Sequence, residues 1–310
     1  GSAPAGSTVA NAISDTGGEG IIIQNNPALT SGTTTQIRID NVSLQNNNST
    51  AIRIDGDASN TQIFAGTGTG IVKNTGGSAI GVEGGSPTFA YVGGISNTNP
   101  ADGSPSYLLS VHQTTSGSIQ VGSNTASLVD TANGIQLTEN TDSNIRVLNA
   151  QIASVGPQGL YAANNTNSGS STLFEFLNID INAATSAGVY LDANTQPMTF
   201  SNLNINLLSA GATGFQSRNS TGIITTNLGN TIATASTTQP AVMIESSNIE
   251  MNLLTVNSGL TNGGPVAALQ FLTTSTGTFA IGQAFTVGGT KGTNLDVLNT
   301  SAVGVSLPPP

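Results

Sequence analysis

The feature of this sequence that most restricts its fold is a short phrase that returns every 25 to 31 residues. The phrase consists of a small residue, an apolar residue, any residue and a second apolar residue, as in Ala51–Ile54 and Gly134–Leu137. An apolar alternation with a period of two is typical of a β-strand that buries one face. Each copy therefore predicts one strand of a structural repeat. Further copies begin at Gly20, Ala79, Ser106, Gly159, Gly188, Gly214, Ala241, Ala268 and Asn294.

Two more strand-like phrases follow within each repeat, separated by clusters of Gly, Asn, Ser and Thr that are typical of turns. The second phrase comes about ten residues after the first and occurs at 36–39, 62–65, 118–121, 144–147, 248–251 and 278–281. The third is a shorter apolar pair, as at Val42/Leu44, Ile179/Ile181, Ile205/Leu207, Leu254/Val256 and Phe285/Val287. Three strands per repeat predict one coil of a parallel β-helix.

We therefore predict an all-β fold: a single-stranded right-handed parallel β-helix, or β-solenoid, of about 11 coils of about 27 residues each. A spacing of about 4.8 Å between coils gives a rod of roughly 50 Å. The right-handed sense is expected because parallel crossover connections are almost always right-handed. The predicted inward pairs of the first strand are Ile52/Ile54, Ile80/Val82, Tyr107/Leu109, Ile135/Leu137, Val189/Leu191 and Val242/Ile244.

The ends of the chain differ in composition from the repeats. Residues 1–19 are rich in Gly, Ser and Ala and are expected to form a lead-in or N-terminal cap, with Gly1-Ser2 as a cloning scar. Residues 20–307 are the predicted β-helix domain, and 308–310 are the start of a Pro-rich linker. We expect a piece of a larger protein with flanking domains. No apolar run is long enough for a membrane-spanning helix, so we expect no membrane insertion by this segment.

Composition narrows the range of partners and chemistries. The net charge is −10, and the six Lys and Arg residues are scattered, which argues against nucleic acid as a partner. The chain has no cysteine, so disulfides and thiolate metal sites are excluded. His112 is the single histidine and is expected on the surface, in the loop after the Tyr107 strand; a multi-histidine metal site is excluded, and a Ser/His/Asp catalytic triad is disfavoured.

The repeat pattern over residues 20–307 resembles the right-handed parallel β-helices of the pectin-lyase-like superfamily. The resemblance lies in architecture, since no catalytic signature of that superfamily is present. A looser similarity exists to passenger regions of bacterial autotransporters and to adhesin repeats, in which Gly-Xaa-Ile phrases and Asn-rich turns recur. Gly77-Ser78-Ala79-Ile80 only approximates the Gly-Gly-Ala-Ile motif of the chlamydial polymorphic membrane proteins. That family is therefore not assigned.

Ionisable residues recur four positions beyond several anchors, where equivalent positions should stack. Asp55 and Glu83 are expected side by side, at a spacing compatible with a retaining glycosidase pair or with calcium. Asp57 belongs to the candidate calcium ligands because Asp55-Gly56-Asp57 resembles the opening of a calcium loop, although Gly66 occupies the place of the closing glutamate. The alternative is a solvated surface. Asp192, Arg218 and Glu245 are expected to form a structural ladder.

Two tyrosines are the candidate ligand-binding residues. Tyr161 and Tyr190 occupy the outward middle position of consecutive first strands and could form a platform for a sugar. Cross-strand ring packing explains the pair equally well. The chain has no Trp, so such a platform would be small.

These observations favour a non-enzymatic structural or adhesive module of a larger secreted or cell-surface bacterial protein, located outside the cell or at the outer membrane. Its partner would be a surface glycan or a host or neighbouring-cell protein. The alternative is a polysaccharide lyase or glycoside hydrolase on the same scaffold, because this architecture carries enzymes and inert rods alike. An ice- or mineral-binding Thr array is disfavoured because the Thr runs do not share a register. No cofactor is expected other than calcium.

Overall fold

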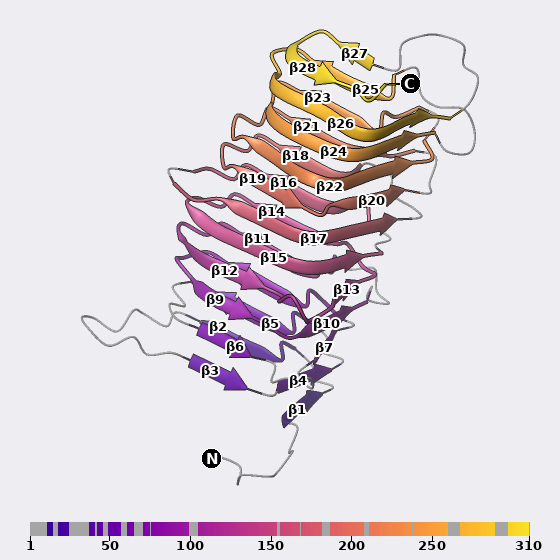
Figure 1. Ribbon diagram of the computed structural model, residues 1–310. Helices are drawn as coiled ribbons and strands as arrows, with labels where there is room; N and C mark the ends of the chain where they lie inside the picture. Colours follow the sequence, from indigo (N-terminus) through magenta and orange to yellow (C-terminus); the bar gives the residue numbers. More distant parts are fainter. Residues whose placement is uncertain are drawn as a thin grey trace.

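The computed structural model describes most of the chain, in segments. The described residues are 11–14, 18–24, 37–40, 42–45, 49–56, 61–64, 71–74, 76–98, 105–153, 156–167, 169–181, 187–207, 211–236, 238–259, 267–288 and 297–309. Every regular element among them is a β-strand. These residues contain no helix that is long and apolar enough to cross a membrane. The strands stack into an elongated solenoid with β1 (Asn11–Ser14) and β28 (Ala302–Ser306) at opposite ends (Figure 1).

One face of the solenoid is an eleven-stranded parallel sheet, called sheet B here, built from the first phrase of each repeat. Its register is continuous, so that Ile52 pairs with Ile80, and Ile80 pairs with Leu109. The strands are β2 (Ile21–Gln24), β5 (Ile52–Asp55), β8 (Ile80–Glu83), β11 (Leu109–His112), β14 (Ile135–Thr138), β16 (Gln158–Ala163), β18 (Ala187–Asp192), β21 (Thr213–Arg218), β23 (Val242–Glu245), β25 (Leu269–Leu272) and β27 (Val297–Asn299).

The second and third phrases together form a seventeen-stranded parallel sheet, called sheet A. We predicted two separate strands there, but in several coils both phrases form one long strand that bends at a corner. The strands besides β1 and β28 are β3 (Ile37–Asp40), β4 (Val42–Gln45), β6 (Thr61–Phe64), β7 (Ile71–Asn74), β9 (Thr88–Tyr91), β10 (Gly94–Asn97), β12 (Gly117–Val121), β13 (Leu128–Asp130), β15 (Ser143–Ile152), β17 (Thr172–Ile181), β19 (Met198–Ser201), β20 (Asn204–Leu207), β22 (Ile224–Thr234), β24 (Asn248–Ser258) and β26 (Thr276–Val287).

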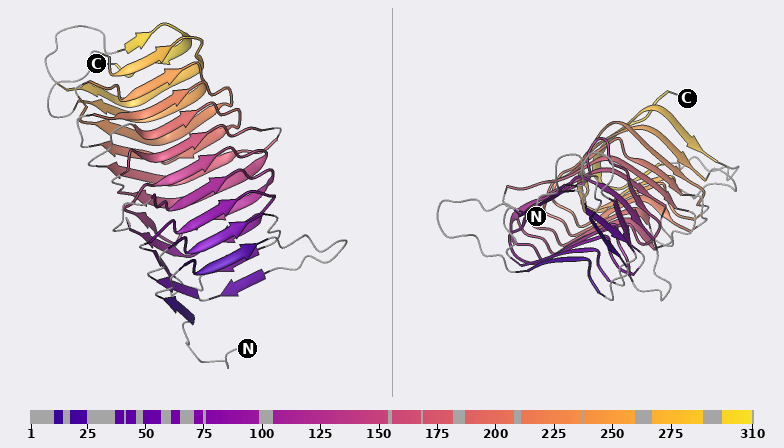
Figure 2. Two further views of the ribbon diagram at one scale, coloured as in Figure 1. Left: turned by 180° about the vertical axis from the view of Figure 1, so that it is seen from behind. Right: turned by 90° about the horizontal axis from the view of Figure 1, so that it is seen from below.

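The parallel β-solenoid predicted from the sequence is confirmed. In Figure 1 the strands of sheet A in front run from left to right while the chain rises from β1 to β28. Seen from behind, the strands of sheet B also run from left to right, so the helix is right-handed (Figure 2). The segment expected to be a lead-in contributes β1, which pairs in parallel with β4.

The core is one continuous set of inward side chains between the two sheets. Ile52, Ile54, Ile135 and Leu137 have no exposed surface, as the alternation predicts. The first, small residue of each phrase is explained by close packing at the corner. A Cβ atom on Gly159 would lie 2.6 Å from Cγ2 of Ile179 in the third strand of the same coil, and Gly188 and Gly214 meet Ile205 and Ile232 in the same way.

One of the predicted inward pairs was wrong. We expected Tyr107 and Leu109 to point inward, but Leu109 and Val111 occupy the inner positions and Tyr107 precedes the strand. A shift of two residues preserves alternation, so the pattern alone could not distinguish the two registers. The large Leu108 also stands at the position that is small in the other coils, where it is fully buried. The copy expected to begin at Asn294 is also displaced by two residues. Val297 pairs with Leu269 and so takes the first inward position, for which the phrase predicted Leu295.

The turn after sheet B has the same conformation in coil after coil. Its first residue has a positive φ between 49° and 73°, at Gly56, Gly84, Gln113, Glu139, Asn164, Ala193, Asn219, Ser246 and Thr273. The residue after it is a buried asparagine in three successive coils, and these asparagine side chains form a ladder. Nδ2 of Asn140 donates to Oδ1 of Asn165 at 2.8 Å, and Nδ2 of Asn165 donates to Oδ1 of Asn194 at 2.8 Å. The ladder satisfies buried backbone groups that the turn would otherwise leave unpaired.

Candidate functional site

The outward face of sheet B collects most of the residues that the sequence marks as functional. Its middle column begins with Ile22 and Arg53. It continues through Gly81, Ser110 and Gln136 to the two tyrosines. The sequence-based interpretation placed Leu108 in this column. The corrected register buries Leu108 and puts Ser110 there instead.

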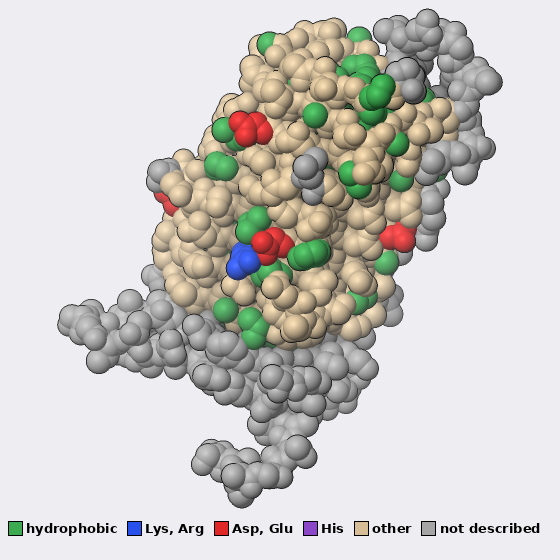
Figure 3. All heavy atoms as spheres, in the orientation of Figure 1, with side chains coloured by type: hydrophobic (Ala, Val, Ile, Leu, Met, Phe, Trp, Pro, Cys, Tyr) green, Lys and Arg blue, Asp and Glu red, His purple; other side chains and the backbone are tan. Residues whose placement is uncertain are grey.

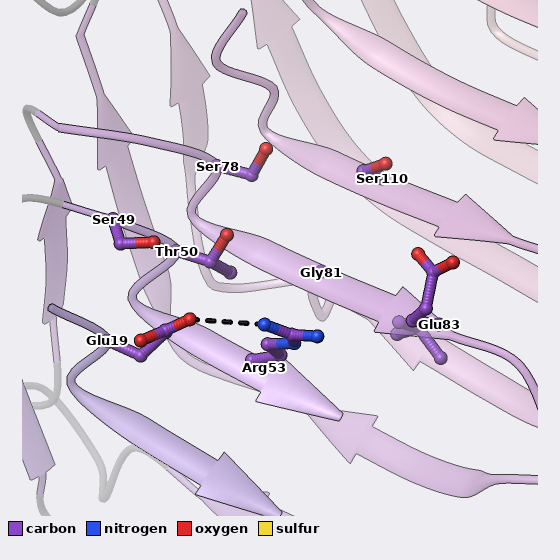
Figure 4. A pocket seen from close by; sticks show the side chains of 9 residues that line it. Glu19, Ser49, Thr50, Arg53, Ser78, Gly81, Glu83 and Ser110 are labelled. Carbon is purple, nitrogen blue, oxygen red and sulfur yellow. Dashed lines mark hydrogen bonds and ion pairs between the residues drawn. The ribbon is translucent and has the colours of Figure 1, made fainter. Parts of the chain in front are cut away.

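A hollow of about 200 Å³ lies over Gly81, because that position has no side chain between Arg53 and Ser110 (Figure 4). Its lining is polar apart from Val82, with Glu19 and Arg53 on one side and Glu83 on the other. The remaining lining residues are Ser49, Thr50, Ser78 and Ser110.

The guanidinium of Arg53 is held between two carboxylates. Its Nη1 lies 3.3 Å from Oε1 of Glu19, and its Nη2 lies 3.2 Å from Oδ2 of Asp55. The same Asp55 oxygen accepts a hydrogen bond from Nε2 of Gln24 at 3.2 Å. The positive charge is thus already paired, and the hollow presents carboxylates and hydroxyls to a ligand.

The column at the end of each sheet B strand differs from the sequence-based prediction. Asp55 and Glu83 are register neighbours, as expected. The next member is His112 and not Ser110, because the register of β11 is shifted by two residues. His112 is the last residue of β11 and does not lie in the loop that follows the strand.

His112 joins Glu83 to Thr138 across three coils. Its Nε2 lies 4.0 Å from Oε1 of Glu83, and its Nδ1 lies 2.9 Å from Oγ1 of Thr138. A carboxylate, an imidazole and a hydroxyl in a row are the groups of a catalytic triad. The flanking N–H groups of Gln113 and Glu139, however, donate to carbonyls of neighbouring coils. They cannot act as the oxyanion-stabilising donors that acyl transfer requires.

The calcium hypothesis rested on Asp55, Asp57 and Glu83. Asp57 lies outside the described residues. Within the described part of the chain, no group of three or more His, Cys, Asp or Glu side chains is arranged to hold a metal ion. Oδ2 of Asp55 accepts hydrogen bonds from Arg53 and Gln24. The geometry around Asp55 therefore fits an ion pair with Arg53 better than a calcium site.

The tyrosine pair is placed as the repeat predicted. Tyr161 and Tyr190 are register partners, with ring centroids 5.7 Å apart and ring planes tilted by 33°. Partial burial raises the pKa of the Tyr161 hydroxyl, and the charge of Asp192 adds to this effect. Because the rings pack on one another, each uses one face for its neighbour and leaves less area for a ligand.

Arg218 is the last residue of β21, the sheet B strand that follows the strand of Tyr190. It forms a hydrogen bond with Tyr190, and its Nε lies 2.9 Å from Oε2 of Glu245. Both interactions raise the pKa of the guanidinium. The predicted Asp192–Arg218–Glu245 ladder has the expected register, and Arg218 turns to Glu245.

Two further features were not predicted from the sequence. Phe176 lies at the corner of β17 with a φ of 56° and 52% of its surface exposed, an unusual conformation for an aromatic residue. The asparagine ladder was detectable, because Asn140, Asn165 and Asn194 each follow a sheet B strand by the same short interval.

The chain was compared with known protein families, curated proteins and solved structures. No family model, no curated protein and no solved structure matches the chain.

Proposed function

We propose that this chain is a non-enzymatic structural or adhesive module of a larger secreted or cell-surface bacterial protein, with sheet B as its contact face. The observation that carries this proposal is the continuous register of sheet B. It arranges outward side chains in straight columns at the spacing of neighbouring strands, about 4.8 Å. An extended partner, such as a surface glycan or a protein of a host or neighbouring cell, can contact many coils of such a face at once.

The size of the hollow and the character of the surface also support this role. About 200 Å³ is below the range of roughly 300–1,000 Å³ that is typical of small-molecule sites. Only 7% of the residues are charged, and few charged side chains appear on the sheet A side of the molecule, which faces the reader in Figure 3. A surface of this kind suits a spacer or a contact surface better than a charged catalytic groove.

A polysaccharide lyase or glycoside hydrolase is the second candidate. One observation favours it: Glu83 faces Arg53 and Glu19 across the hollow (Figure 4). Nε2 of His112 lies 4.0 Å from Oε1 of Glu83. Two carboxylates beside a cavity are the groups that glycoside hydrolysis uses.

One experiment separates the two candidates. The protein is incubated with a panel of neutral and acidic polysaccharides, and both retention on the polymer and release of products are measured. The adhesive role predicts retention without products, and reduced retention for the Tyr161→Ala/Tyr190→Ala variant but not for Gln270→Ala, which lies in the same column. Product release that is abolished by Glu83→Gln and kept by Glu139→Gln would establish the enzyme instead.

A further inference from the structure

A cluster of polar side chains is buried inside the solenoid, away from the sheet B face. Asn97, Ser106 and Asp130 have no exposed surface. Asn97 and Asp130 are register partners on the inward side of sheet A, and the next residue of the same column is Ile152. A carboxyl group thus occupies a column that continues as isoleucine.

The cluster is a chain of hydrogen bonds that links successive coils. The hydroxyl of Ser106 donates to the carbonyl of Gly77 at 2.6 Å. Nδ2 of Asn97 donates to Oγ of Ser106 at 3.0 Å and to Oδ1 of Asp130 at 2.7 Å. The other oxygen, Oδ2 of Asp130, accepts from the backbone N–H groups of Ala132 and Gly134. The last of these bonds fixes the start of β14 in sheet B.

The electrostatic position of Asp130 is unfavourable for a charge. Burial is the largest influence and raises its pKa to about 6, against the lowering effect of the hydrogen bonds from Asn97, Gly134 and Ala132. No ionisable group of the described residues contributes to this shift. The residues that face the carboxyl group from β10, from the corner before β14 and from β15 are neutral: Asn97, Gly134 and Ile152.

We propose that Asp130 makes this coil an acid-stabilised joint of the rod, which holds firmly when the carboxyl group is protonated and loosens when the group ionises. In the neutral form Oδ2 still accepts the Gly134 N–H, and a turned Asn97 amide can accept the proton on Oδ1. In the ionised form the carboxylate still accepts hydrogen bonds from Asn97, Ala132 and Gly134, but its negative charge lies in the core without a positive partner among the described residues.

The direction of the pH effect follows from the raised pKa. The folded chain binds the Asp130 proton more tightly than the unfolded chain, so this contribution to stability is complete below the ordinary value of 3.8. It is lost as the pH rises through about 6. The loosening should begin where Asp130 holds Gly134, between the hollow and the tyrosine pair.

The test compares unfolding of the whole chain in denaturant between pH 4 and pH 8 for the wild type, Asp130→Asn and Asp180→Asn. The Asp130→Asn variant should lose stability relative to wild type at pH 4 and recover it by pH 7. The ratio of the two unfolding constants should change on the order of a hundredfold. Asp180 is an exposed carboxylate on β17, so its variant should follow the wild-type pH profile. A difference between wild type and Asp130→Asn that stays constant from pH 4 to pH 8 would overturn the proposal.

A second measurement uses the wild-type protein alone, so it tests the proposal even if the Asp130→Asn variant fails to fold. In native protein labelled with ¹³C at the aspartate side-chain carboxyl carbons, one carboxyl signal should titrate with a midpoint near 6. It should be shielded from a paramagnetic reagent in solution, because Asp130 is buried. If every shielded aspartate signal titrates at or below the ordinary value of 3.8, the joint does not exist.

Discussion

The coil that ends at Asp130 and the coils from β15 onward solve the same packing problem in different ways. In three of these coils, those of β16, β18 and β21, a glycine at the first position of the phrase makes room for an isoleucine of the third strand, as for Gly159 and Ile179. In the coil of β11 the equivalent residues are Leu108 and Asp130, a larger residue at the corner and a smaller polar one in the column. The core is filled in both regions, but among the described residues Asp130 is the only buried carboxyl group.

The two regions also differ in how their strands are divided. Before β15, the second and third phrases are separate strands, as in β9 and β10 or β12 and β13. From β15 onward they form one strand of ten to twelve residues in β15, β17, β22, β24 and β26, and only β19 and β20 are separate among the described strands. The comparison teaches that one repeat can carry either a dry apolar corner or a hydrogen-bonded polar joint, because each coil contacts only its neighbours.

The largest expected effect comes from moving the polar chemistry into the apolar region. Ile205 is fully buried between Ile179 and Ile232. The substitution Ile205→Asn removes buried methyl groups and leaves an amide without the partners that Asn97 has, so it should cost roughly 4 kcal/mol or more. Denaturant melts measure the loss, with the outward Asn206→Ala as the control. Equal stability of the two variants would show that this column accepts a buried polar side chain as readily as the column position of Asn97 does.

The second prediction concerns the strand next to the joint. The substitution Ile135→Ala should cost about 2–4 kcal/mol, because it leaves a cavity between coils. Its outward neighbour Gln136 is half-buried, and Gln136→Ala should change the free energy of unfolding by less than about 0.5 kcal/mol. Gln136→Pro should be far worse than Gln136→Ala, because proline cannot donate to the sheet. Similar melts for Ile135→Ala and Gln136→Ala would mean that the side chains of β14 do not alternate as described.

A third prediction sharpens the role of Asn97. The substitution Asn97→Val removes the side-chain donor to Asp130 and should raise the pKa of that carboxyl group further. The loss of stability should be about 2 kcal/mol at pH 8, where Asp130 is ionised, and clearly smaller at pH 4, where it is protonated. Thermal unfolding at the two pH values decides this. A loss that is equal or larger at pH 4 would contradict the assignment of the buried charge.

The smallest expected effect is a gain of stability. Phe176 has a left-handed backbone conformation that costs an L-residue about 1–2 kcal/mol and costs glycine nothing of the kind. Because the ring is half exposed and contributes little burial, Phe176→Gly should stabilise the protein by up to about 1 kcal/mol. Asn202 has the equivalent conformation at its own corner, and Asn202→Gly should gain less, since asparagine tolerates it. A lower melting temperature for Phe176→Gly would show that the ring packs on its surroundings.

The sequence predicted most of the fold because the period of two and the repeat of about 27 residues are both visible in it. The pairing of Tyr161 with Tyr190, and of Asp55 with Glu83, followed from counting alone. The row from Glu83 through His112 to Thr138 did not, because the error of two residues at Leu109 moved His112 off the strand. Asp130 was missed for another reason: whether an aspartate faces inward depends on a corner that local alternation does not describe.

A chain made of similar repeats can also pair in a wrong frame, with one coil left out. The apolar columns discriminate poorly against such a slip, since isoleucine would still meet isoleucine. The residues that do not repeat discriminate well. A slipped frame would separate Asp130 from Asn97 and leave a buried carboxyl group without its amide donor. It would likewise interrupt the ladder of Asn140, Asn165 and Asn194. The irregular polar residues therefore make the correct frame more stable than a slipped one. In a version of this solenoid with identical coils, the two frames would no longer differ in these buried hydrogen bonds.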